Sequence, residues 1–241
     1  MAGPTWLEPL FPDLAPPFVH GMTNVRGPDL KSDPDAAVHA AAVAEVGAAA
    51  GLVAIAWSRQ VHGGTVKRVE APGCAGEADA LWTDRTGLAV MGRSADCPIV
   101  LLAGRNAADA PLWGMAHASW RSTASDITGH LLEAMIDGGL DPATTVAIVA
   151  PSAGPCCYEV GDEVREAFVA GLGAGAARFF SEARGKWILD LWAANSDALR
   201  RRGLAPDRVH CDGRCTICGD EFPSYRRDGA KSGRFGVFVG A

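Results

Sequence analysis

Two residues with reactive side chains flank a pair of short apolar segments near the middle of the chain. Cys97 comes just before the segment Ile99–Leu102, and His117 comes just after the segment Leu112–Ala116. Because both segments are short and apolar, we predict two buried strands joined by a polar loop. If these strands pair as a hairpin, the thiol of Cys97 and the imidazole of His117 lie at the same end of the sheet.

A third candidate, His62, stands where another apolar run gives way to a Gly-Gly turn. Zinc readily binds thiolate sulfur and neutral imidazole nitrogen, and a catalytic zinc site uses three protein ligands and leaves one position open. Such an ion lowers the pKa of bound water to about 7 and polarises a carbonyl or leaving group. We hypothesise that His62, Cys97 and His117 bind one catalytic zinc ion. The spacing also allows a buried thiol and two core histidines.

Two charged residues adjoin these candidates in the sequence. Arg121 follows His117 by four residues, and its guanidinium is suited to a phosphate or carboxylate near the metal. The alternative is a solvated arginine at the start of a helix. Asp96 directly precedes Cys97, where it can orient a ligand histidine, act as a base, or cap a turn. We take Arg121 and Asp96 as candidate catalytic residues, and Arg121 also as a substrate ligand.

A second set of soft ligands occurs near the C-terminus, where His210, Cys211, Cys215 and Cys218 lie within nine residues. Four such ligands can close a structural zinc site. Their spacing is not that of a common zinc knuckle, however, so reduced buried thiols are the alternative.

Three further residues are candidates for binding substrate. Tyr158 follows the adjacent pair Cys156-Cys157, whose disulfide would be strained, so we expect all three side chains to pack or to line the cleft. Arg226 belongs to the segment Ser224-Tyr-Arg-Arg-Asp-Gly, which can bind an anion or stack on a base; a surface loop is the alternative. Gln60 lies two residues before His62.

The composition is that of an ordinary globular protein, with 241 residues of which 48% are hydrophobic and 21% charged. The net charge of −6 argues against a general nucleic-acid or membrane-surface binder. Because no run of about 18 uncharged apolar residues occurs and the proline-rich start does not resemble a signal peptide, we expect a cytoplasmic protein. The odd number of cysteines, seven, favours reduced thiols or metal ligands. We expect a monomer and leave an oligomer open.

Strands and helices mix without strict alternation, which predicts a mixed sheet flanked by helices in an α+β fold. We predict an irregular arm over residues 1–17 and one catalytic domain over residues 18–241. Expected strands cover residues 18–23, 53–57, 65–69, 80–83, 88–91, 99–102, 112–116, 144–149, 209–211 and 235–239. Expected helices cover residues 32–50, 122–137, 161–169, 174–183 and 191–202, with a glycine-rich loop before residue 77 and a loop from 212 to 231.

Taken together, these segments resemble the laccase-domain family, also called multicopper polyphenol oxidases and now regarded as purine nucleoside phosphorylases. The matching pieces occur in family order: Gln60-Val-His-Gly, Ala78-Asp-Ala-Leu, Ala95-Asp-Cys, Ala116-His-Ala-Ser-Trp-Arg, Gly154-Pro-Cys-Cys-Tyr-Glu-Val-Gly, Cys215-Thr-Ile-Cys, Ser224-Tyr-Arg-Arg-Asp-Gly and Gly233-Arg. The chain departs from the family at Pro98, which directly follows Cys97, and at Ser119 and Ser122, where the family has glycines.

The resemblance implies that His62, Cys97 and His117 hold the family's metal, in a laccase-domain-like α/β sandwich. It further implies that the protein cleaves purine nucleosides with phosphate. Adenosine, inosine, guanosine and methylthioadenosine are the implied substrates, with adenosine deamination as an accompanying activity. Either Asp96 or Tyr158 is expected to supply a proton to the departing base.

Three other functions fit parts of the sequence. A copper-dependent phenol oxidase would use the two histidines and the cysteine, but a multicopper site needs far more than the six histidines present. A cysteine hydrolase would use Cys97 as nucleophile and His117 as base. A zinc-stabilised binding module would hold the metal without catalysis.

Overall fold

The computed structural model describes residues 4–11 and 14–241 and contains two six-stranded mixed sheets. The first sheet has the order β1-β2-β15-β7-β3-β5 and the second the order β14-β10-β8-β9-β6-β4. The strands of the first sheet are β1 (Leu7–Glu8), β2 (Val19–Thr23), β3 (Ile55–Arg59), β5 (Gly73–Glu77), β7 (Ala89–Ser94) and β15 (Phe235–Gly240). Those of the second are β4 (Val66–Arg68), β6 (Ala80–Thr83), β8 (Ile99–Arg105), β9 (Pro111–His117), β10 (Val146–Val149) and β14 (Val209–Cys211).

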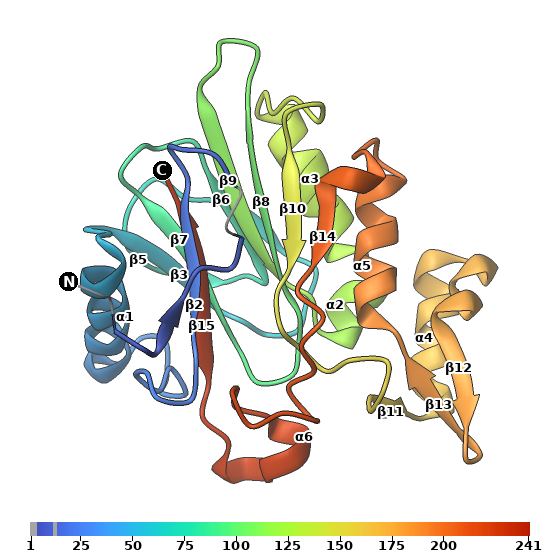
Figure 1. Cartoon of the computed structure of the whole chain (residues 1–241). Coiled ribbons are helices and arrows are strands. Elements are labelled where there is room, and N and C mark those ends of the chain that lie inside the picture. Colours follow the sequence, from blue (N-terminus) through green and yellow to red (C-terminus); the bar gives the residue numbers. More distant parts are fainter. Residues whose placement is uncertain (1–3, 12–13) are drawn as a thin grey trace.

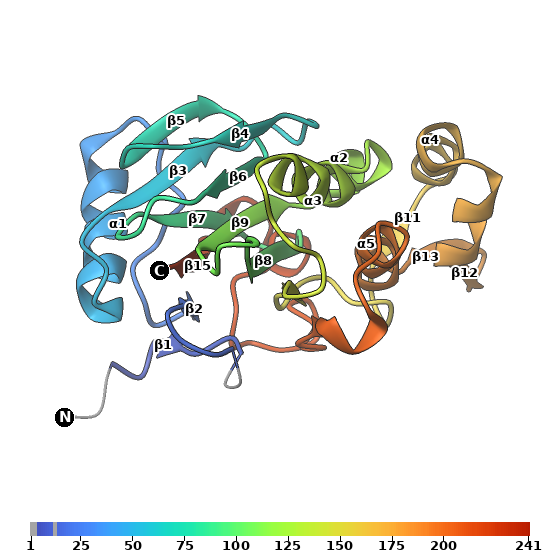
Figure 2. The same cartoon turned by 90° about the horizontal axis from the view of Figure 1, so that it is seen from above.

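The two sheets pack face to face, with helices on the outer faces (Figures 1 and 2). The core between them contains large buried side chains from both sheets, including Trp113, Met115 and Val237. Gly92 of β7 lets the sheets approach closely, since a Cβ there would lie 2.9 Å from the side chain of Ile99 and from the sulfur of Met115. This apolar interior fixes the positions of the loops at the strand ends.

Helices cover the outer faces because each presents an apolar stripe to a sheet. On the first sheet lies α1 (Ala37–Ala50), which packs through Val43 and Val46. The second sheet is covered by α3 (Ile127–Asp137) and α5 (Leu191–Arg200), which meet strand residues in a separate apolar cluster. The structure therefore confirms the predicted α+β class.

A smaller unit lies beside the sandwich. It consists of a three-stranded sheet of order β11-β13-β12, formed by β11 (Glu159–Val160), β12 (Phe180–Ala183) and β13 (Lys186–Leu189), with α4 (Asp162–Leu172) beside it. Its buried side chains, among them Phe168 and Leu189, pack with residues of α5 and of the short helix α2 (Trp120–Ala124). A four-residue helix, α6 (Tyr225–Asp228), and three 3-10 turns, Ala174–Phe179, Pro206–Arg208 and Gly229–Lys231, complete the described elements.

The predicted hairpin is present and sets the geometry of the site. Strands β8 and β9 pair antiparallel, and Ile99 lies directly opposite His117. Cys97, two residues before Ile99, therefore lies at the same sheet end as His117.

Several predicted elements differ from the structure. The first helix ends at Gly51 (φ 73°) as expected but begins only at Ala37. The residues before Ala37 form turns, and the Pro34 carbonyl accepts a hydrogen bond from the Trp57 side chain in place of a helical one. The predicted helix 122–137 is two helices, since Asp126 adopts a left-handed conformation (φ 58°) between them.

The predicted helix 174–183 is wrong: it is a 3-10 turn followed by β12, whose backbone pairs with β13. The glycine-rich loop contains β5, which pairs parallel with β3, and the predicted loop 212–231 contains α6. In the predicted arm 1–17, of which residues 4–11 and 14–17 are described, β1 pairs with β2. In the described part of the chain, every helix is too short or too polar to cross a membrane.

Candidate active site

His62, Cys97 and His117 converge at one end of the sandwich. One ligand atom from each side chain lies within 4.8 Å of the others, and the two imidazole centroids are 5.0 Å apart. His62 lies in the turn after β3, Cys97 in the loop between β7 and β8, and His117 at the end of β9. The structure thus brings together the three predicted metal ligands from segments far apart in the sequence.

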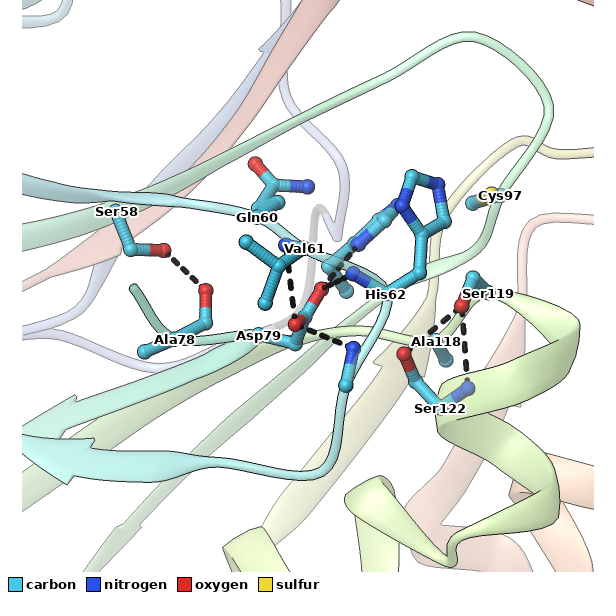
Figure 3. Close-up of polar contacts among 12 residues, drawn as sticks. Ser58, Gln60, Val61, His62, Ala78, Asp79, Cys97, Ala118, Ser119 and Ser122 are labelled. Atoms are coloured by element: carbon cyan, nitrogen blue, oxygen red, sulfur yellow. Dashed lines mark hydrogen bonds and ion pairs between the residues drawn. The ribbon is translucent and has the colours of Figure 1, made fainter. Parts of the chain in front are cut away.

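The turn that carries His62 is held by one buried carboxylate. His62 has a positive φ of 61°, a conformation that non-glycine residues adopt rarely and at a cost. The backbone amides of Val61, His62 and Gly63 donate to the Asp79 carboxylate at 3.2, 3.0 and 2.7 Å. Figure 3 shows the bonds from Val61 and His62 as dashed lines. These three bonds offset the cost and fix the imidazole of His62 over the site.

The same carboxylate orients His117. Its Oδ1 lies 2.8 Å from His117 Nδ1, and both side chains are buried. Burial raises the pKa of Asp79, but the hydrogen bond from His117 and the one from Gly63 outweigh it, so the pKa lies below its ordinary value. The carboxylate is therefore ionised and holds a proton on Nδ1, so that in the neutral, metal-binding form of His117 it is Nε2 that offers its lone pair.

Asp79 is a candidate site residue that the sequence pattern did not single out. In the sequence it stands within the segment Ala78-Asp-Ala-Leu, and Asp96 is the residue expected to orient a histidine. The available signal was a charged residue at the start of the apolar strand β6, a position where burial demands a partner.

The three side chains fit a metal ion. Bond lengths of about 2.0–2.1 Å to nitrogen and about 2.3 Å to sulfur place the ligand atoms of a tetrahedral site roughly 3.5 Å apart, which is compatible with the observed upper limit of 4.8 Å. Carboxylate-bound imidazole is the usual arrangement for a metal-ligating histidine. Two imidazoles and one thiolate suit zinc, and they are also the equatorial ligands of a blue-copper site.

Without a metal, Cys97 and His117 favour an ion pair. Burial raises the pKa of Cys97, but attraction to His117 and hydrogen bonds from both histidines bring it to about 6. Conversely, burial lowers the pKa of His117, while the Cys97 thiolate and Asp79 raise it to about 9. Between these values the sulfur is a thiolate, the form that binds metals and acts as a nucleophile.

A cavity of about 510 Å³ opens over these residues. Four cationic side chains line it, namely Lys31, Arg93, Arg226 and Arg234. The predicted residues Gln60, Asp96 and Tyr158 line it as well, together with His62, Cys97, His117 and Tyr225. The volume of the cavity and its mixture of aromatic and charged groups suit small ligands of which at least one is an anion, such as phosphate.

Asp96 and Gln60 hold the walls of this cavity. Asp96 is buried, and its two oxygens accept hydrogen bonds from the Thr216 hydroxyl (2.7 Å) and from the Arg226 amide (2.6 Å). The Gln60 side chain donates to the Arg93 carbonyl (2.8 Å) and accepts from the Arg93 amide (2.9 Å). Both side chains therefore connect segments that are remote in sequence.

Tyr158 and Arg226 form one edge of the cavity. The guanidinium of Arg226 lies 5.0 Å from the centre of the Tyr158 ring and donates to the Glu159 carbonyl at 2.7 Å. Burial raises the pKa of Tyr158 well above its ordinary value, so its hydroxyl stays protonated. Both residues also border an adjoining cavity of about 680 Å³.

Arg121 is placed differently from the other candidates. Its guanidinium stacks over the ring of Trp120, 4.2 Å from the ring centre, and it is not among the described residues that line the 510 Å³ cavity. The side chain is exposed on α2. The cations that share a cavity with the candidate metal ligands are instead those of the cavity wall.

The second predicted ligand set does not assemble as expected. The ring of His210 packs 4.4 Å from the ring of Phe11, and Cys211 is exposed on the edge strand β14. The cysteines at 215 and 218 meet Cys156 and Cys157 instead. The partners come from a distant loop, which the local spacing could not reveal.

Comparisons with known proteins agree with this architecture. The family described as multi-copper polyphenol oxidoreductase laccase matches residues 27–241. A Xylella fastidiosa protein named purine nucleoside phosphorylase is 40% identical over 195 residues, covering 76% of this chain and 70% of that one. The Escherichia coli protein named purine nucleoside phosphorylase YfiH is 31% identical over 185 residues, with coverage of 76% and 72%.

Solved structures show the same fold. YlmD from Geobacillus stearothermophilus superimposes with a TM-score of 0.79 at 27% identity, covering 94% of this chain and 93% of that one. The Neisseria meningitidis protein NMB0706 superimposes with a TM-score of 0.80 at 25% identity, covering 97% and 98%. The sequence match over nearly the whole chain and the shared fold lead to one assignment. This chain belongs to the multi-copper polyphenol oxidoreductase laccase family.

Proposed function

We propose that this protein is a zinc-dependent purine nucleoside phosphorylase that converts a purine nucleoside and phosphate to the free base and ribose 1-phosphate. The observation that carries the proposal is the position of the three metal-ligand candidates in a cavity of about 510 Å³ lined by four cations. The names of relatives at 31–40% identity support the same reaction.

The reaction requires two reactants to be held in line. A phosphate oxygen forms a bond to C1′ of the ribose, the bond from C1′ to the base nitrogen breaks, and its electron pair leaves with the base, which then takes a proton. Arginine binds phosphate oxygens through two parallel hydrogen bonds. In this proposal the phosphate is held by Arg226, Arg93 and Arg234, which line the cavity.

Tyr158 and Asp96 have separate roles in this proposal. We propose that the Tyr158 hydroxyl, kept protonated by burial, donates a hydrogen bond to the departing base. Asp96 already accepts bonds from Thr216 and the Arg226 amide, so its role is to position the arginine. A zinc ion on His62, Cys97 and His117 would supply Lewis-acid stabilisation of developing negative charge.

The proposal extends to the substrates that the family resemblance implies. Adenosine, inosine, guanosine and methylthioadenosine differ at the purine edge and the 5′ position, and the cavity is large enough for any one of them. Adenosine deamination is proposed as a second reaction at the same site. We place Arg121, which stacks on Trp120, outside the phosphate-binding group.

The copper oxidase alternative has less support. The donor set of two histidines and a cysteine would suit one copper ion, but a multicopper oxidase needs a further histidine-rich cluster. Among the residues that the structure describes, the four other histidines do not line the cavity: His20, His39, His130 and His210. The remaining alternative, a cysteine hydrolase, draws on the lowered pKa of Cys97.

One experiment separates these functions. The purified protein is analysed for zinc and copper, and adenosine is then incubated with it, with and without phosphate, and followed by chromatography. We expect the purified protein to contain zinc. Adenine and ribose 1-phosphate should form only when phosphate is present, whereas some inosine should form in either case. Adenine formation without phosphate, or turnover that survives complete metal removal, would contradict the proposal.

A matched pair of variants makes the test specific. Cys97→Ser removes a proposed ligand, and Cys211→Ser removes an exposed thiol of β14. We expect the first to abolish phosphorolysis and the second to leave it unchanged. Equal activity in the two variants would exclude a role for the metal centre.

A further inference from the structure

Four cysteines from two distant loops meet outside the cavity. Their sulfur atoms all lie within 4.8 Å of one another, with 2.8 Å between Cys157 and Cys218 and 3.4 Å between Cys156 and Cys218. Cys215 is the fourth member. All four are free thiols, and the proposed reaction uses none of them.

We propose that Cys156, Cys157, Cys215 and Cys218 bind one structural zinc ion, separate from the ion of the candidate active site. Four thiolates form a closed tetrahedral set, the arrangement typical of structural zinc. Bond lengths of about 2.3 Å place neighbouring sulfurs of such a tetrahedron about 3.8 Å apart, inside the range that the four thiols already span. To bind the ion, the four sulfur atoms therefore need to move by less than the length of one zinc–sulfur bond.

The backbone presents these thiols before any ion binds. Ser152 and Cys215 form a bridge between the two loops, with hydrogen bonds from the Ser152 amide to the Arg214 carbonyl (3.2 Å) and from the Thr216 amide to the Ser152 carbonyl (3.0 Å). Each loop then turns tightly, as shown by the bonds from the Cys157 amide to Gly154 (3.1 Å) and from the Gly219 amide to Cys215 (3.1 Å). Such a framework limits the entropy lost on metal binding.

Backbone donors also prepare one sulfur as an anion. The Gly154 amide lies 3.3 Å from the Cys215 sulfur, to which it donates, and the amides of Ile217 and Cys218 stabilise the same thiolate. Hydrogen bonds to a charged group favour its charged form. A divalent cation bound by the four sulfurs would displace their protons and balance the charge of the resulting thiolates.

The position of the cluster indicates what the ion does. Cys157 directly precedes Tyr158, and the loop that holds Cys218 leads into α6 and Arg226, so the ion would join the two segments that form one edge of the cavity. Arg227 strengthens the second loop by donating to the carbonyls of Thr216 and Phe222 at 2.7 and 3.1 Å. The zinc would therefore fix the distance between Tyr158 and Arg226.

The test uses a variant that leaves the cluster intact. Cys97→Ser removes the active-site ligand and retains six of the seven cysteines. Purified under reducing conditions, wild type should contain two zinc ions per chain and this variant one. In the variant, a thiol reagent should modify the four clustered cysteines only after a strong chelator is added, and cobalt substitution should produce the sulfur-to-cobalt charge-transfer bands of a four-thiolate site.

Variants of the cluster give the reciprocal result. Cys156→Ser and Cys218→Ser, made separately, should each reduce the zinc content of wild type from two ions to one, whereas Cys211→Ser should retain two. With its cavity edge loosened, each cluster variant should show a KM for nucleoside raised severalfold and a smaller change in kcat. Circular dichroism verifies that the variants are folded.

Two results would overturn the inference. One is a Cys97→Ser protein that holds no zinc while all six thiols react at once. The other is a thiol titration of this protein that finds two thiols fewer than six and recovers both after treatment with dithiothreitol. That result would identify a Cys157–Cys218 disulfide. Failure of the active-site proposal has a different signature: wild type with one zinc, retained in Cys97→Ser and lost in Cys218→Ser.

Discussion

The carboxylate of Asp79 lies 2.8 Å from Nδ1 of His117 and also accepts the amide of His62. One buried group thus positions both imidazoles of the candidate metal site, although His62 follows a strand of the first sheet and His117 ends a strand of the second. The register of β8 against β9 places Cys97 opposite them. The candidate metal ligands are therefore held in place by the fold itself.

Replacing Asp79 should weaken metal binding. Asp79→Asn keeps the size of the side chain but replaces one carboxylate oxygen by an amide nitrogen. That nitrogen cannot accept the hydrogen bonds that the oxygen accepts. Loss of such a ligand-orienting group typically lowers metal affinity by about 10–100-fold. We expect this loss in a chelator-competition titration with zinc.

Asp84→Asn is the control for that titration. Asp84 is an exposed carboxylate that pairs with Arg68 at 2.8 Å, and its loss should leave zinc affinity unchanged. An unaltered affinity in Asp79→Asn would show that the ligands are positioned without the carboxylate.

The reactivity of Cys97 should reveal its lowered pKa. In metal-free protein its pKa of about 6 lies below the ordinary value of 9.0, so the thiolate is present above pH 6 and is lost as the pH falls through that value. The rate of alkylation by iodoacetamide should therefore reach a plateau above about pH 7, and zinc should abolish it. Mass spectrometry of the modified peptides measures the rate.

Cys211 provides an internal control in the same experiment. Although Cys211 is exposed, neighbouring atoms partly desolvate its sulfur and raise the pKa of the thiol, so its alkylation should continue to increase above pH 8. If Cys97 followed the same profile as Cys211, the ion pair with His117 would not exist in the metal-free protein.

The sequence predicted what depends on local pattern. Short apolar runs located β8 and β9, and their expected pairing placed Cys97 beside His117, as the register of Ile99 against His117 confirms. The helix expected from residue 191 begins at Leu191, and the Asp190 side chain caps it by accepting the Ala193 amide at 2.8 Å. In these cases the local sequence pattern is sufficient to predict the element.

What the sequence did not reveal depends on tertiary contacts. The segment 174–183 has helical composition, but its Phe180 lies buried against Phe168 with centroids 5.3 Å apart, and pairing with β13 overrides helix propensity. The cysteine cluster joins residues about sixty positions apart, so a local spacing rule selected the wrong partners for Cys215 and Cys218.

Arg226 and Arg121 should respond differently to substitution. Arg226 lines the cavity, whereas Arg121 stacks on Trp120 outside it. A hydrogen bond to a charged group is worth about 1.5–3 kcal/mol, so Arg226→Ala should raise the KM for phosphate by about tenfold or more. Steady-state kinetics at varied phosphate should show little change for Arg121→Ala, and a larger effect at Arg121 would restore it as the phosphate ligand.

Ser119 should stabilise the segment that follows His117. Its hydroxyl caps α2 by accepting the Ser122 amide at 3.1 Å and lies 2.8 Å from the Ser122 hydroxyl, and both serines are buried. Ser119→Ala removes the cap and leaves the Ser122 hydroxyl without this partner. Because loss of an N-cap costs about 1 kcal/mol and an unsatisfied buried group about 1–3 kcal/mol, we expect unfolding free energy to fall by roughly 1–3 kcal/mol in urea titrations. Ser181→Ala, on the exposed part of β12, should change it by less than about 0.5 kcal/mol. Equal stability of the two variants would mean that α2 does not depend on its cap.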